Sequence, residues 1–159
     1  MISEFLDYFE ARQVAWREGR PVWWTLAPLR YRSAALGTTV IIPAETVTDL
    51  ASVPRAPFAF WLAGGRGTRS AVLHDFPYLF GYWLRADGGR QYVTKADADA
   101  VFLESLRADP IGGAGSVIAR LMHAAVRFGG RGVWRQPARA RALNPEWHAA
   151  GGPSLPVEA

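Results

Sequence analysis

The chain has 159 residues, half of them hydrophobic and a fifth charged, which suits one compact domain with a substantial core. It contains no cysteine, so disulfide frameworks and thiolate zinc sites are excluded and the fold must depend on packing. The net charge is +4, and Lys95 is the only lysine among cations that are otherwise scattered arginines. So small and dispersed an excess does not favour nucleic acid as a partner.

The first residues carry acids, and they lack the basic start and the apolar run of a secretory signal. No stretch approaches the ~18 apolar residues that a membrane span requires. We therefore expect no membrane span, and we expect synthesis and folding in a cytoplasm. Residues 2–10 keep a helical spacing of apolar side chains, which predicts a short amphipathic helix. Its apolar positions are Ile2, Phe5, Leu6 and Phe9.

Strand-forming runs follow, separated by turn residues. Residues 13–17 and 21–26 flank the turn-like sequence 18–20 and predict a β-hairpin. Residues 29–32 and 38–42 continue the pattern, so the first third is predicted to be a small antiparallel meander. The side chains expected on its apolar face are Trp16, Trp23 and Trp24.

Prolines and glycines then interrupt the β pattern. Pro54 and Pro57 predict an irregular connection up to the apolar run 58–62, and the glycines that follow predict a flexible loop. From Thr68 onward the sequence becomes helical, with helices predicted over residues 70–76, 95–108 and 116–128. Strands first and helices later predict an α+β fold, in which the meander packs against three or so C-terminal helices.

The helix predicted over 116–128 has the clearest pattern. Five apolar side chains keep the spacing of one helical face: Val117, Leu121, Ala124, Ala125 and Phe128. Gly129 and Gly130 follow where a left-handed C-terminal cap is expected. The pattern therefore predicts both the helix and its end.

Beyond Trp134 the sequence consists largely of arginine, alanine, proline and glycine, with prolines too close together for regular structure. We therefore predict a single α+β domain over residues 1–134 and an extended C-terminal arm over 135–159. An arm with spaced apolar anchors usually lies along its own domain or along a partner. The residues expected to bind a partner are Arg131, Trp134, Arg135, Arg139, Arg141 and Trp147.

Four polar residues stand out because the pattern around them predicts burial. Asp97 follows Thr94 by three and completes a capping box, but Asp99 falls on the apolar face of the helix 95–108. A buried carboxylate needs an arginine, a histidine, backbone donors or a metal ion as its partner. His74 and Asp75 interrupt another apolar helical run, with Tyr78 four residues after His74.

Asp49 is the fourth of these residues, beside Thr48 and Ser52. It can cap its own turn, or it can face His74 and Asp99. In the second case, the histidine and carboxylates could bind a divalent metal such as zinc, with an open position for water as a hydrolase needs. A structural hydrogen-bond network explains the same residues, and no compact metal-ligand motif is present.

Four motifs in a fixed order resemble the phage and prophage family called domain of unknown function 1353. They are residues 48–54 (TDLASVP), 74–78 (HDFPY), 98–102 (ADAVF) and 125–130 (AVRFGG). The resemblance spans roughly Trp23 to Trp134, and the family's recurring polar positions fall on Asp49, His74, Asp75 and Asp99. The sequence departs from the family at Pro77, where an apolar, helix-compatible residue is more common.

The resemblance implies a phage setting, in the virion tail or in the lysis and cell-wall apparatus. One hypothesis is a virion component of the tail or tail tip, located in the virion after synthesis in the host cytoplasm. Its arm would dock on other phage virion proteins or on further copies of the chain. The alternative is a metal-dependent hydrolase, for example of cell-wall amide bonds, with Asp49, His74 and Asp99 as ligands and Asp75 either supporting those ligands or acting as general base.

Overall fold

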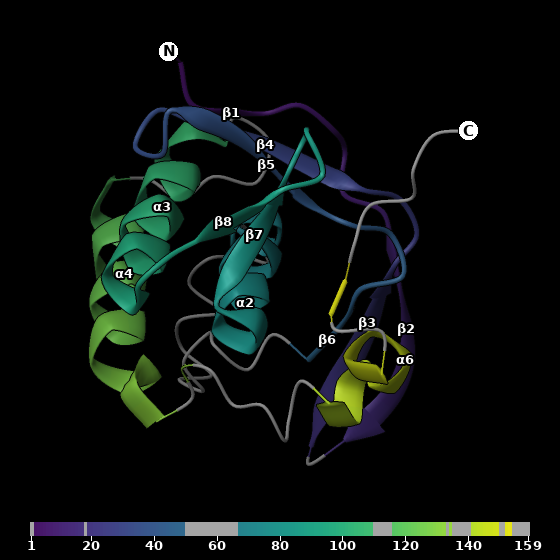
Figure 1. Ribbon diagram of the computed structural model, residues 1–159. Helices are drawn as coiled ribbons and strands as arrows, with labels where there is room; N and C mark the ends of the chain where they lie inside the picture. Colours follow the sequence, from purple (N-terminus) through teal and green to yellow (C-terminus); the bar gives the residue numbers. More distant parts are fainter. Residues whose placement is uncertain are drawn as a thin grey trace.

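The computed structural model describes residues 2–17, 19–49, 67–109, 116–132, 134, 141–149 and 152–153. In these residues most strands precede the helices, as the sequence predicts for an α+β fold (Figure 1). The predicted irregular connection and the apolar run 58–62 lie outside the described residues. Gly67 is described, and it begins the next helix in a left-handed conformation with φ 83°.

Two antiparallel sheets form the β part of the fold. The larger sheet has the order β1-β4-β5-β7-β8, and its strands are β1 (Glu4–Phe5), β4 (Leu29–Ser33), β5 (Thr38–Ile42), β7 (Tyr82–Arg85) and β8 (Arg90–Tyr92). The smaller sheet has the order β2-β3-β6, and its strands are β2 (Ala11–Arg17), β3 (Arg20–Thr25) and β6 (Val47–Thr48). The predicted hairpin is confirmed as β2 and β3, and the next two predicted strands are β4 and β5.

Three helices lie where the sequence predicts them: α2 (Thr68–Phe80), α3 (Lys95–Ala108) and α4 (Ser116–Gly129). The 3-10 turn η1 (Gly130–Gly132) and the helix α6 (Pro145–Ala149) were not predicted. The predicted bounds of α3 are confirmed, and the Thr94–Asp97 capping box is present in both directions. In Figure 1, α3 and α4 lie side by side, and α6 lies near the smaller sheet.

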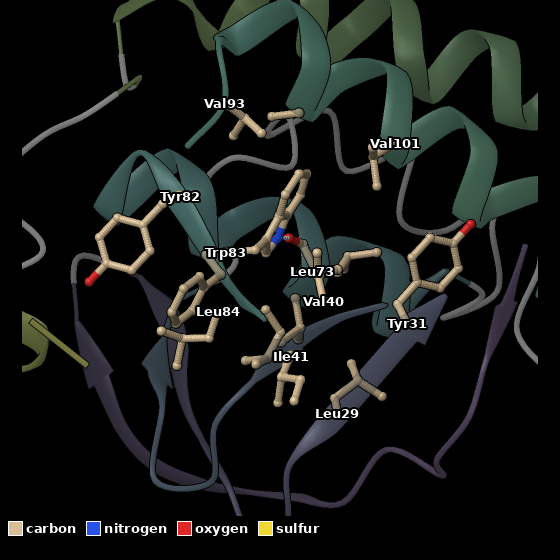
Figure 2. Close-up of a cluster of buried hydrophobic side chains, with 14 of the residues drawn as sticks. Leu29, Tyr31, Val40, Ile41, Leu73, Tyr82, Trp83, Leu84, Val93 and Val101 are labelled. Atoms are coloured by element: carbon tan, nitrogen blue, oxygen red, sulfur yellow. Dashed lines mark hydrogen bonds between the residues drawn. The ribbon is translucent and has the colours of Figure 1, made fainter. Parts of the chain in front are cut away.

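The main core lies between the larger sheet and helices α2 and α3 (Figure 2). Its largest fully buried side chains include Tyr31, Phe76 and Trp83. The predicted apolar face of the meander is only partly correct, because Trp16 is 67% exposed while Trp23 and Trp24 are half-buried. Burial of the aromatic and aliphatic core side chains supplies the main driving force for this fold.

The prediction of a helix over residues 2–10 is wrong. Glu4 and Phe5 pair with Arg32 and Tyr31 of β4, and the Glu4 carboxylate also forms an ion pair with Arg32 at 2.5 Å. A strand of two residues is too short to show the alternation of apolar and polar side chains that identifies a strand. The helical spacing of apolar residues in this segment therefore does not reflect its structure. Pairing with β4 therefore decides the conformation of this segment.

A hairpin that we did not predict joins α2 to α3. It consists of β7 and β8 and turns at Gly88, which has φ 78°. β7 pairs antiparallel with β5 and extends the larger sheet. The hairpin places Trp83 in the core, where it is 0% exposed.

Helix α2 continues through Pro77 to Phe80, beyond the predicted end at Phe76. A proline has no backbone N–H, so the carbonyl of Leu73, four residues earlier, loses its helical donor. The indole Nε1 of Trp83 donates a hydrogen bond to this carbonyl oxygen at 2.8 Å (Figure 2). The β7 tryptophan therefore compensates for the proline, and the helix keeps His74 and Tyr78 on one face.

The predicted glycine cap of α4 is also wrong. Among the described glycines, the left-handed conformation occurs at positions that do not include Gly129 or Gly130, and the chain continues into η1. Gly130 is required for a different reason, because a Cβ atom there would lie 2.5 Å from the Tyr78 hydroxyl. The glycine thus permits close approach of η1 to α2.

Candidate functional site

The carboxylate of Asp99 is the centre of a buried hydrogen-bonded cluster. Lys95 lies four residues earlier on α3, and His74 and Tyr78 are four residues apart on α2, so each pair occupies one helical face. Asp99 Oδ1 is 2.9 Å from His74 Nε2 and accepts a hydrogen bond from the Tyr78 hydroxyl at 2.6 Å. Asp99 Oδ2 accepts a hydrogen bond from Lys95 Nζ at 2.7 Å. The prediction that Asp99 is buried beside His74 is confirmed.

Lys95 joins a third helix to this cluster. Its ammonium also donates hydrogen bonds to the carbonyl oxygens of Val126 at 3.2 Å and Arg127 at 3.3 Å. These carbonyls lie near the C-terminal end of α4, where the helix dipole favours a cation. The charge of Lys95 also balances that of Asp99; the Asp99 side chain is 2% exposed and the Lys95 side chain 20%.

The imidazole of His74 is enclosed by aromatic rings. It is 0% exposed, and its centroid lies 4.2 Å from the ring of Tyr78 and 4.6 Å from that of Phe102. An ionised Asp99 favours the tautomer in which Nε2–H is the donor. Nδ1 then carries a lone pair, and it has no hydrogen-bond partner among the described residues.

Burial and hydrogen bonding fix the charge states in the cluster. Burial lowers the pKa of His74, and the hydrogen bond with Asp99 opposes this effect only in part. Burial by itself would raise the pKa of Asp99, but hydrogen bonds from His74, Lys95 and Tyr78 outweigh it and hold that pKa at about 2. Burial and the Asp99 carboxylate raise the pKa of the Tyr78 phenol. At neutral pH the cluster thus has an ionised Asp99 beside a neutral His74 and a neutral Tyr78.

Asp75 is a second buried carboxylate, 1% exposed, on the helical turn that carries His74. It accepts a hydrogen bond from the hydroxyl of Thr48, at the end of β6. The motif at residues 48–54 therefore contacts α2 through its first residue, Thr48. Asp49, the next residue, is half-buried.

The residues do not fit the predicted metal centre. In the part of the chain that the structure describes, no group of three histidine, aspartate or glutamate side chains could hold a metal ion. Asp49, His74 and Asp99 are all within that part, so they do not form the predicted ligand set there. The Asp99 oxygens instead accept the side-chain hydrogen bonds of α2 and α3.

A surface recess of about 470 Å³ lies away from the polar cluster. It is lined by Ser3 and by side chains on the outer side of α3, including Leu103, Glu104 and Arg107. Glu104 is already engaged there, since its carboxylate accepts hydrogen bonds from Tyr31 and Ser33. None of the lining residues belongs to the Asp99 cluster.

Trp134 and the described residues of the predicted arm contact the rest of the chain's own domain. The ring of Trp134 stands edge-on to Tyr78, with centroids 4.9 Å apart, and Trp147 packs near Phe80 at 6.2 Å. The side chain of Asn144 hydrogen-bonds both the N–H and the carbonyl of Val47 in β6, each at 3.1 Å. These anchors therefore attach the C-terminal segment to the fold.

The segment differs from the predicted extended arm in one respect. The segment contains helix α6, and its Pro145 occupies the first helical position, where a missing N–H costs nothing. Arg131 and Arg141 are exposed and open to a partner, whereas Arg135 and Arg139 lie outside the described residues. Partner binding through this segment stays a prediction.

Sequence reasoning missed the roles of three residues in or beside the cluster. Lys95 and Tyr78 are partners of Asp99, and Thr48 is a partner of Asp75. The contact between Lys95 and Asp99 could have been predicted, because residues four apart on a helix lie side by side. The contact between Thr48 and Asp75 depends on how β6 meets α2, which no local pattern indicates.

The fold and the cluster define a small α+β domain whose helices are joined by buried polar groups. Residues 23–126 match the family model described as "Protein of unknown function (DUF1353)", and the chain belongs to this family. No curated protein and no solved structure matches the chain. Among the described residues, no helix is long and apolar enough to cross a membrane.

Proposed function

We propose that the protein is a structural or accessory component of a phage virion, in the tail or tail tip, which docks on neighbouring subunits. The phage setting comes from the family resemblance. The observation that carries the proposal is the closed state of the polar cluster: His74, Asp75 and Asp99 are 0%, 1% and 2% exposed. Groups so enclosed stabilise a fold and offer no surface to a substrate.

The exposed features of the molecule support docking rather than chemistry. Arg131 and Arg141 are exposed in the C-terminal segment, whereas Trp134 and Trp147 pack against the domain. The exposed surface of this segment therefore carries basic side chains. Large apolar side chains are exposed on α4. A subunit held among others in the virion would cover such surfaces, with other virion proteins or with further copies of the chain.

Mass spectrometry of purified particles tests this proposal. The phage or induced prophage that encodes the chain should carry the protein in intact virions, at a fixed ratio to the known tail proteins. Particles from a phage with the gene deleted serve as the control for contamination from the lysate. Absence of the chain from wild-type virions would end the proposal.

A hydrolase of cell-wall amide bonds is the second candidate, and one observation favours it. A neutral imidazole held by a carboxylate, with a lone pair unpaired at Nδ1, has the character of a general base, as His74 does. Asp75 is the nearby carboxylate that the sequence suggested for catalysis. Either residue would act only if the enclosing segments opened.

Digestion of purified peptidoglycan decides between the two candidates. Wild-type protein that releases soluble fragments, with His74→Gln losing this turnover while staying folded, would establish the hydrolase. The virion proposal expects no release by either protein. Circular dichroism of the variant controls for folding.

A further inference from the structure

Five apolar side chains form a row on the outer face of α4, which we call the α4 stripe: Val117, Leu121, Ala124, Ala125 and Phe128. Val117, Leu121 and Phe128 are 69%, 60% and 74% exposed, and the two alanines are half-buried. With a rise of about 1.5 Å per residue, the stripe is ~16 Å long. This is the face with the clearest helical spacing in the sequence.

The fold does not use the α4 stripe for its own core. The opposite face of the helix packs against Phe102 and Leu106 of α3, through Ala119, Met122 and Val126. A surface helix normally presents polar residues on the side away from the core. Single exposed apolar residues are common, but a row along three helical turns marks an interaction surface.

Arginines border the stripe on one side. Arg120 and Arg127 are both exposed, and a spacing of seven places them along the same edge of the helix. Arg131 is exposed directly after it, in η1. Helix α4 contains no acidic residue, and within the described residues neither Arg120 nor Arg127 takes part in an ion pair. The surface is thus apolar with one positive edge.

We propose that the α4 stripe docks an apolar helix with an acidic flank, presented by a different protein. Ala124 and Ala125 in the middle of the stripe leave room for a second helix to approach closely between larger side chains. Acids on one flank of that helix would meet Arg120 and Arg127 and fix its orientation. An anionic membrane surface would also attract these arginines, and the vesicle measurement below separates the two cases.

A second copy of the chain fits this surface poorly. Two α4 helices packed antiparallel about a two-fold axis at the middle of the stripe would place Arg120 of one copy beside Arg127 of the other. Like charges at such a contact repel. The acids near the N-terminus, Glu4 and Asp7, already form ion pairs within the chain. Isologous pairing of two stripes therefore leaves both arginine edges without acidic partners, which an acid-flanked helix of a different protein supplies.

This inference rests on the proposed function only in taking the partner to be another virion protein. The surface itself can be tested without a virion. Failure of the binding experiment below would not affect the proposal that the protein is a virion component. Absence of the protein from virions would likewise not affect the binding result.

The probe is a fluorescein-labelled designed helical peptide with a leucine and alanine stripe and glutamates along one flank. A second peptide differs only in carrying lysines at those flanking positions. Fluorescence anisotropy with the full-length protein should show saturable binding of the glutamate peptide, weakened by added salt. Leu121→Asn with Phe128→Ser should weaken binding by at least about tenfold. Trp16→Ser, which removes an exposed aromatic side chain from β2, is the matched control and should leave binding unchanged.

The charge reversal Arg120→Glu with Arg127→Glu is the decisive variant. It should bind the lysine peptide and no longer bind the glutamate peptide. The melting temperature should fall only slightly, because both arginines are exposed and only Arg127 lies in the last turn of α4, where a cation is favoured. Binding of neither peptide by wild type, or equal binding of both, would overturn the proposal. Two further outcomes would also overturn it. One is stripe-dependent binding to phosphatidylglycerol vesicles without peptide binding, and the other is stripe-dependent dimerisation in sedimentation.

Discussion

Nε2 of His74 lies 2.9 Å from Oδ1 of Asp99, and this contact joins α2 to α3 in the interior of the protein. The two residues meet across 25 positions of sequence, and the chain surrounds them with the hydroxyl of Tyr78 and the ammonium of Lys95. A buried donor or acceptor that loses its partner costs about 1–3 kcal/mol, and a charged group costs more. Substitutions in the cluster should therefore affect stability strongly.

Replacement of Asp99 by alanine should lower the free energy of unfolding by about 3–5 kcal/mol, because the buried His74 and Tyr78 would lose their acceptor and the partly buried Lys95 its ionic partner. Urea denaturation measures the loss. Asp97→Ala, two residues earlier on the same helix, is the matched control. It removes one side of an exposed capping box and should cost only about 1 kcal/mol. Equal losses at the two positions would contradict a central role for Asp99.

Stability should fall as the pH is lowered, in two steps. Burial holds the pKa of His74 below the ordinary 6.5, so the unfolded chain binds this proton more readily than the folded one. The His74 contribution is therefore complete above about pH 6.5 and is lost as the pH falls from there toward the lowered folded value. The pKa of Asp99 is about 2 in the fold against 3.8 ordinarily, so its contribution is lost only below about pH 4.

Urea unfolding at a series of pH values measures both steps. His74→Gln should remove most of the slope below about pH 6.5, after its overall loss of stability is taken into account. His123→Gln is the control, because burial also lowers the pKa of His123 but that side chain is only partly buried. It should remove a smaller part of the slope. A profile for His74→Gln parallel to that of wild type would show that His74 titrates alike in both states.

Gly130→Ala should destabilise the protein while Gly129→Ala should not. A Cβ atom at position 130 would lie 2.5 Å from the Tyr78 hydroxyl and 2.9 Å from a ring carbon, so Tyr78 would have to move away from Asp99. We expect a loss of about 1–3 kcal/mol, typical of overpacking. A Cβ atom at position 129 meets nothing within 4 Å, so alanine there should be neutral or stabilising. Thermal denaturation of both variants checks the contrast, and a neutral Gly130→Ala would contradict the packing of η1 on α2.

The Trp83 indole and Pro77 should be energetically coupled. Trp83→Phe leaves the Leu73 carbonyl without a donor and should cost at least about 1–3 kcal/mol. In a Pro77→Ala background the new backbone N–H can donate to that carbonyl, so the same substitution should cost less. A double-mutant cycle measures the coupling, which we expect to be about 1 kcal/mol. Strictly additive losses would show that the indole does not replace the missing helical hydrogen bond.

Local patterns predicted the parts of the structure that depend on neighbouring residues. The capping box at Thr94 and Asp97 and the full extent of α3 are examples, because both depend on contacts within a few residues. The burial of Asp99 could also be predicted, since its position in the helical period places it on the inner face. The need for a partner then followed from the cost of burying a charge, and His74 was the correct candidate.

Other features depend on contacts that the sequence pattern does not contain. Residues 2–10 have apolar side chains at helical spacing, but Glu4 and Phe5 form a strand because they pair with β4. The α4 stripe shows the same limit, because periodicity identifies apolar faces but does not say which one the core uses. In α4 the core takes the face of Met122 and Val126. The β7–β8 hairpin does have a local signal, because the Asp87-Gly88 pair is typical of a tight hairpin turn.

The central claim is that the cluster around Asp99 is a closed, structural hydrogen-bond network. Nitrogen NMR of the histidine side chains tests it most directly, because it reports the tautomer and protonation of His74 and the exchange of its ring proton with water. We predict a neutral ring with its proton on Nε2, slow exchange, and no protonation until the pH falls well below 6.5. Titration near pH 6.5 with rapid proton exchange would contradict the claim and reveal a site open to solvent.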